Sequence, residues 1–276
     1  MFPTTVRGLK EQLAQPLGKA EVQFLIKTFQ YACMFFFGFG FLTFLAGSVV
    51  IQISGSGFGW VGTVLCSLIG FLLYFPLNFY AMKYKNDPVA ADSKLVTTAF
   101  TILACTFFFL FMGVIGVLGN IVSGPSSTTI GWLGKMIAFV FGITLVIYAI
   151  PLGIAFQIQK KSTILNLNKF LNFCGFSYIA FFVILLLLSF AGGFVTGAGS
   201  WILFLLSAIM LFVSPIITLY RMRSIVPYIN HNDPIERKRW EHYFAFEISF
   251  QLLQLAWYIA RIVATLVNGR STSRLQ

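Results

Sequence analysis

The sequence predicts an all-α protein that crosses a membrane several times, and three observations support this fold class. Of the 276 residues, 58% are hydrophobic and only 10% are charged, whereas soluble domains carry about one quarter charged residues. The mean hydropathy is +0.86. The apolar residues also form seven runs, and each is long enough for a membrane-spanning helix, which takes about 20 residues. We therefore expect a polytopic membrane protein with seven transmembrane helices.

The seven predicted spans fill most of the chain and leave no room for a soluble domain. A polar segment, residues 1–23, precedes them, and it lacks the order of a signal peptide, in which a short basic region leads at once into an apolar core. The spans form one transmembrane domain, residues 24–267, and a short tail, residues 268–276, follows it. In order, the spans are residues 24–48, 58–82, 95–119, 131–157, 168–192, 200–220 and 243–267.

Positive charge alternates along the connections between these spans. The N-terminal segment and Lys27 together account for four lysines and arginines, and the second, fourth and sixth connections carry three, three and five. The first, third and fifth connections carry none. Because basic residues favour the cytoplasmic side, the pattern predicts a cytoplasmic N-terminus and, with seven spans, a C-terminus outside. Charges distributed in this way do not form the basic patch of a nucleic-acid-binding protein.

The motifs of enzymes and metal sites are missing. His231 and His242 lie eleven residues apart without cysteine or carboxylate at metal-ligand spacing. No glycine-rich phosphate loop or serine nucleophile elbow is found. We expect no enzymatic activity, no metal and no cofactor. Four cysteines, each in a separate apolar run, are expected to be small buried hydrophobic residues: Cys33, Cys66, Cys105 and Cys174.

The seventh span carries a polar stripe on an otherwise apolar helix. Its members follow one another at steps of four, three, four and three residues, which places them on one face about 80° wide. An unpaired charge in hydrocarbon costs at least about 2.5 to 3.5 kcal/mol. The stripe is therefore expected to face other helices, with this last helix central in the bundle. The stripe comprises Glu247, Gln251, Gln254, Tyr258 and Arg261.

Two interpretations of Glu247 remain open at this point. It is either an acid that pairs or snorkels at the membrane interface, or a titratable group that gates or lines an ion path. In the second case its candidate partners are Arg221 and Arg223 after the sixth span, or Lys27 on the first. Arg261 lies about 21 Å farther along the helix axis, at 1.5 Å per residue, so it cannot pair with Glu247. We expect Arg261 to act as an anchor in the outer leaflet.

Two segments of the last third carry a resemblance to a known family. They are YRMRSI, residues 220–225, and AFEISFQLLQLAWYIARIV, residues 245–263. In this order and separation they resemble the sixth- and seventh-helix motifs of the Bax inhibitor-like family, the transmembrane Bax inhibitor motif proteins, including the bacterial YccA-type branch. The first span, FLIKTFQYACMFFFGFGFLTFLAG, and the segment TTAFTILACTFFFLF, residues 97–111, are similar to the family's corresponding segments.

The resemblance implies a seven-helix bundle in which the other six helices surround the last. It also implies a pH-sensitive calcium leak, protection against cell death in eukaryotes and, in one bacterial branch, modulation of a membrane-bound ATP-dependent protease. In the leak members, an acid in the sixth-helix motif and one in the seventh form the pH-sensitive latch. Here Arg221 and Gln251 stand at those two positions. Two facing carboxylates can share a proton, but an arginine and an amide cannot, so the latch is not carried over.

A rearranged contact remains open, in which Arg221 and Glu247 form a charge pair across the last two helices. Because arginine stays protonated, such a pair would be a structural clasp rather than a pH switch. The expected protein is thus a Bax inhibitor-like member of a bacterial cytoplasmic membrane that leaks calcium or another cation, with the acid pair lost. One alternative is a non-transporting regulator that binds a membrane protease through its N-terminal segment and sixth connection. The other is a small-solute transporter, which the missing internal repeat disfavours.

Overall fold

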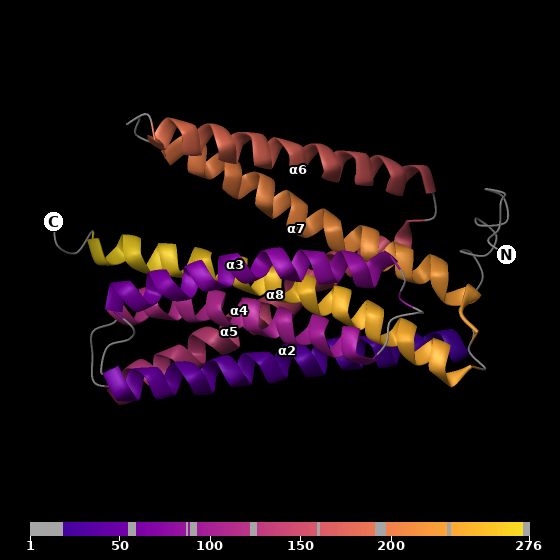
Figure 1. Cartoon of the computed structure of the whole chain (residues 1–276), viewed down its shortest axis with the longest axis horizontal. Coiled ribbons are helices and arrows are strands. Elements are labelled where there is room, and N and C mark those ends of the chain that lie inside the picture. The colour runs from indigo at the N-terminus through magenta and orange to yellow at the C-terminus, as the bar shows by residue number, and fades with distance from the viewer. Residues whose placement is uncertain are drawn as a thin grey trace. The chain divides into compact units, whose positions relative to one another are not determined.

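A computed structural model shows the chain as a set of long helices (Figure 1). It describes residues 19–54, 59–86, 88, 93–121, 126–158, 161–190, 197–230 and 233–272, and these ranges contain no strand. The helices are α2 (Lys19–Ser54), α3 (Gly59–Asn86), α4 (Ser93–Ile121), α5 (Ser126–Gln157), α6 (Lys161–Phe190), α7 (Gly197–Ile225) and α8 (Pro234–Thr272), with a short 3-10 helix, η1 (Val226–Tyr228), after α7.

Six of these helices, α2, α3, α4, α5, α7 and α8, are long and apolar enough to cross a membrane. The predicted all-α, polytopic membrane fold is therefore confirmed. The predicted count of seven spans stays a prediction, because α6 is not among the six within the part of the chain that the structure describes.

The sixth connection, predicted as a loop over residues 221–242, is largely helical. Residues 221–225 still belong to α7, and α8 begins at Pro234, nine residues before the predicted start of its span. The Oδ1 atom of Asp233 accepts hydrogen bonds from the backbone N–H groups of Ile235 (2.9 Å) and Glu236 (3.4 Å). An aspartate at the N-cap followed by proline in the first helical position is a strong start signal. The charged residues after it therefore extend the last helix instead of forming a loop.

The chain divides into two compact units. The smaller unit comprises Met1–Glu21 and Ile147–Tyr228, and in it α6 and α7 run alongside one another (Figure 1). The larger unit comprises Val22–Val146 and Ile229–Gln276. It contains α2, α3, α4, the first part of α5, and α8. The polar stripe thus lies in the larger unit, whereas Arg221 and Arg223 belong to the smaller one.

Within the larger unit, α3 and α4 form a close antiparallel pair. Gly113 and Gly116 of α4 face Ser67 and Thr63 of α3, and a Cβ atom at either glycine would collide with the facing hydroxyl oxygen. On the other helix, Gly70 packs against Leu110 in the same way. Small residues let two membrane helices approach closely, so this seam joins residues 63–70 of α3 to residues 110–116 of α4.

Helices α2 and α5 meet through aromatic rings and glycines. The rings of Phe36 and Phe141 lie 4.5 Å apart between centroids, and Gly40 packs against the same Phe141 ring. One turn or two farther along, Gly47 contacts Leu133. The order of these contacts makes α2 and α5 antiparallel. The chain therefore alternates in direction from α2 to α5. The first residues of α2 and α4 and the last residues of α3 lie at the same end of the unit.

Candidate functional site

Helix α8 is enclosed by three neighbouring helices of the larger unit. Phe244 meets Phe24 of α2 edge to face, with ring centroids 6.4 Å apart. Phe246 meets Phe100 of α4 at 5.4 Å and Tyr84 of α3 at 5.7 Å. These contacts lie on different sides of α8, so most of its circumference in this region is covered by protein rather than left for lipid.

The carboxylate of Glu247 lies inside this enclosed region. The hydroxyl group of Tyr243, one turn earlier on α8, donates a hydrogen bond to Glu247 Oε1 at 2.6 Å. That distance is typical of an O–H group bonded to a carboxylate, which is among the stronger hydrogen bonds in proteins. The other oxygen, Oε2, is buried as well. Tyr243 and Glu247 are four residues apart and therefore lie on the same face of α8, where they can form this contact.

The next residues of the stripe are also turned into the protein. Gln251 is only 7% exposed, and Tyr258 is buried to a similar extent. The Nε2 atom of Gln254 donates a hydrogen bond of 2.6 Å to the hydroxyl oxygen of Tyr74 on α3. Since the two residues are 180 positions apart in the sequence, this bond ties the last helix to the second span. Polar side chains on facing helices stabilise membrane proteins in this way.

Arg261, at the far end of the stripe, differs from the other four members. It is exposed, and its guanidinium carbon lies 4.9 Å from the centroid of the Trp257 ring, in a cation–π contact. An arginine over a tryptophan is the sort of pair found where a helix leaves the hydrocarbon. The anchor role expected for Arg261 stays a prediction.

The basic residues considered as partners of Glu247 have different surroundings. Lys27 on α2 is exposed, whereas Arg221 and Arg223 on α7 are half-buried. The backbone carbonyl of Arg221 accepts a hydrogen bond from Ser224 Oγ at 2.8 Å. Because Arg221 and Glu247 belong to different units, the clasp between them stays a prediction.

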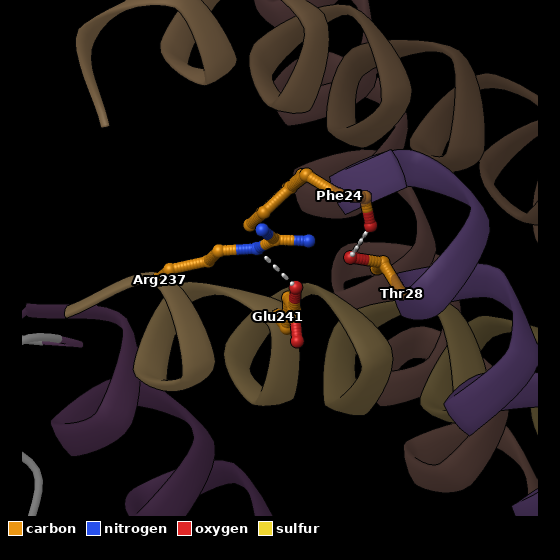
Figure 2. Close-up of polar contacts among 4 residues, drawn as sticks. All are labelled: Phe24, Thr28, Arg237 and Glu241. Carbon is orange, nitrogen blue, oxygen red and sulfur yellow. Dashed lines mark hydrogen bonds and ion pairs between the residues drawn. The ribbon is translucent and has the colours of Figure 1, made fainter. Parts of the chain in front are cut away.

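One buried ion pair was missed by the sequence reasoning. Arg237 Nε lies 2.9 Å from Glu241 Oε1, and the two side chains are only 18% and 5% exposed. Figure 2 shows this pair on the first turns of α8, with Phe24 and Thr28 of α2 alongside. The i, i+4 spacing of opposite charges could have revealed it, but these residues were assigned to a loop. Their pairing keeps a charged stretch of α8 compatible with a buried position.

Tyr84 and Ser249 are further polar residues that sequence reasoning did not single out. Both are fully buried, and neither hydroxyl group has a hydrogen-bond partner among the residues that the structure describes. Leaving a buried hydroxyl unsatisfied costs about 1–3 kcal/mol. The ring of Tyr84 meets that of Tyr243, the donor to Glu247, at 5.3 Å. Tyr84 of α3 thus packs against the tyrosine that donates to Glu247.

Groups that could hold a metal ion are not found in the described ranges, where no three histidine, cysteine, aspartate or glutamate side chains gather. The four cysteines are free thiols in four different helices. They vary in exposure, and the prediction that all four are buried holds only for Cys174. Cys174 is buried, Cys33 and Cys66 are intermediate, and Cys105 is exposed. Cys105 is explained by its place on the outer side of α4, where an apolar thiol faces lipid at no cost.

Comparisons with known proteins give no relative from which a role could be transferred. No protein-family model, no curated protein and no solved structure matches this chain.

Proposed function

We propose that the protein is an integral membrane protein that lets cations leak across the bilayer, with the polar stripe of α8 as the site that admits the ion. The observation that carries this proposal is the half-buried side chain of Glu247 on an enclosed helix, with Oε2 buried and Oε1 hydrogen-bonded to Tyr243. An ionisable side chain within a membrane span is costly, and such residues usually mark ion or proton pathways.

The chemistry of the stripe suits a cation better than an anion. Glu247, Gln251 and Tyr258 offer carboxylate, amide and phenol oxygens on one face of α8, and hard cations such as calcium take oxygen ligands. A calcium ion takes six to eight oxygen ligands. The stripe offers fewer oxygen atoms than this and only one formal negative charge. A site of this kind would bind an ion weakly and release it readily, which fits a leak better than a store.

The seven-span topology and the Bax inhibitor-like resemblance belong to the same proposal. The second half of α6 contains the apolar run AFFVILLLL, which supports a further crossing after its polar first half. With α6 included, the charge alternation places the N-terminus in the cytoplasm and the C-terminus outside, in a bacterial cytoplasmic membrane.

Reporter fusions at the C-terminus test this topology. Alkaline phosphatase fused after Gln276 should be active and a green fluorescent protein at the same place should be dark, since only the former folds outside. A fusion at the N-terminus serves as the control and should give the opposite result. A fluorescent C-terminal fusion would contradict the seventh crossing and reduce the count to six.

Ion flux through the purified protein in liposomes tests the leak. Glu247→Gln should lower the calcium flux several-fold, because it removes the only formal negative charge of the stripe. Glu236→Gln, on the first turn of the same helix, is the matched control and should leave the flux unchanged. An unchanged flux in Glu247→Gln, with unchanged thermal stability, would exclude Glu247 as a gate and as a clasp.

The absence of any flux in the unaltered protein would transfer the proposal to the regulatory alternative. In that case, deleting residues 1–20 should abolish co-purification of a membrane-bound ATP-dependent protease. Retained co-purification after the deletion would remove the N-terminal segment as its binding element.

A further inference from the structure

The outer face of α3 carries an aromatic stripe that ends on a cation. Phe71, Phe75 and Phe79 are 55%, 64% and 66% exposed and follow one another at four-residue steps. The next step of four reaches Lys83, in the last turn of α3, which is exposed as well. Residues four apart form an inclined ridge on a helix, so the three rings and the lysine form a line that winds about 120° around α3.

The length of this line matches one leaflet of a bilayer. Twelve residues separate Phe71 from Lys83, or about 18 Å at 1.5 Å per residue. The hydrocarbon core of a bilayer is about 30 Å thick, so half of it, about 15 Å, is the depth that one acyl chain occupies. The rings of Phe71 and Phe75 already contact each other edge to face at 5.6 Å. The stripe therefore offers a continuous apolar surface one acyl chain long.

Two more lysines lie at the charged end of the line. Lys85 shares the last turn of α3 with Lys83, and Lys94 stands in the first turn of α4. Both are exposed. The glycine seam holds α3 and α4 together, and the described residues of the two helices include no acidic side chain. The sequence between the helices adds Asp87 and Asp92, which lie outside the described residues.

We propose that this face of α3 binds an anionic phospholipid. Its phosphate contacts Lys83, with Lys85 and Lys94 beside it, and one acyl chain lies along Phe71, Phe75 and Phe79. An acidic protein segment fits the lysines but not the exposed rings below them, whereas a phospholipid presents both parts at this separation. Basic residues at the membrane boundary recognise anionic headgroups. A zwitterionic lipid brings a cation that no described acidic side chain of α3 or α4 can balance.

Native mass spectrometry of the full-length protein in detergent tests the charged end. Phosphatidylglycerol should bind at least about tenfold more tightly than phosphatidylcholine, since each lysine near an anionic headgroup contributes a several-fold gain. The combined variant Lys83→Gln, Lys85→Gln and Lys94→Gln should lose this preference. Lys135→Gln, which removes an exposed cation on α5, is the matched control and should keep it. Lys83→Arg should also keep it, because the charge remains.

The same measurement tests the acyl-chain contact and the source of the phosphate. Phe75→Ala with Phe79→Ala should weaken phosphatidylglycerol binding several-fold, whereas Phe41→Ala, at an exposed ring of α2, should not. Inorganic phosphate in millimolar excess should fail to displace the lipid. Displacement by phosphate, equal binding of the two lipids, or an unchanged preference in the combined lysine variant would each overturn the proposal. Circular dichroism of every variant establishes that the helices are retained.

Discussion

Helix α3 is more apolar than helix α8 but is less buried. The span of α3 has a mean hydropathy of 1.8 and is 11% buried within the protein, whereas that of α8 has 1.2 and is 56% buried. In a soluble protein the more apolar helix would be the enclosed one. In a bilayer the surroundings are as apolar as any core, so hydrophobicity alone does not draw a helix inward. The span of α4 makes the same point, since it has a mean hydropathy of 2.3 and is as buried as that of α8. The enclosed position gives the polar stripe of α8 the protein partners that lipid does not offer.

Truncating an aromatic ring on each helix should give the largest difference. Phe246 of α8 is 2% exposed and touches rings of α3 and α4, so Phe246→Ala should cost about 3–5 kcal/mol of unfolding free energy. Phe79→Ala on the outer face of α3 should cost less than about 1 kcal/mol, since lipid or detergent replaces the lost contacts. Denaturant titration in mixed micelles, followed by circular dichroism, measures both. Equal losses would contradict the contrast between an enclosed and an open helix.

A substitution in the glycine seam tests whether the side of α3 that faces α4 holds the helix in place. Gly116→Leu on α4 forces a side chain against Thr63 of α3 and should cost about 1–3 kcal/mol through overpacking. Gly38→Leu on α2 meets nothing within 4 Å and is the control with the same chemistry. The readout is the thermal unfolding temperature in the same detergent. A tolerated Gly116→Leu would show that α3 is held by contacts other than this seam.

A double-mutant cycle on Tyr74 and Gln254 should give the smallest effect. Tyr74→Phe and Gln254→Leu each remove one side of the 2.6 Å hydrogen bond between α3 and α8. Interhelical hydrogen bonds in membranes contribute about 0.6 kcal/mol on average, so the coupling energy should be close to this value. The unfolding free energies of the two single variants and the double variant supply it. A coupling of zero would mean that the polar contact aligns the helices without stabilising them.

The sequence predicted which residues of α8 are turned into the protein, but not which residues of other helices they contact. The steps of four and three residues located the polar stripe of α8, and Gln251 and Tyr258 are indeed buried. Periodicity describes a helix face but not its neighbour. Nothing in the sequence around Gln254 therefore indicated Tyr74, which is 180 positions away.

The start of α8 could have been predicted and was not. The order of Asp233, Pro234 and Glu236 is a helix-start signal, but the basic residues after it were taken as the mark of a connection. Positive charge reports the side of the membrane, not the end of a helix. The same confusion hid the ion pair of Arg237 and Glu241, whose spacing is informative only once the segment is known to be helical.

The enclosure of α8 has a consequence for the timing of biosynthesis. Helix α8, which contacts α2, α3 and α4, leaves the ribosome after them, and 112 residues separate the end of α4 at Ile121 from its start at Pro234. At roughly 5–20 residues per second, the earlier helices wait on the order of ten seconds for their central neighbour. During that interval the rings that later cover α8 face lipid or one another. The close seam between α3 and α4 needs no part of α8, so this hairpin can assemble before α8 is synthesised.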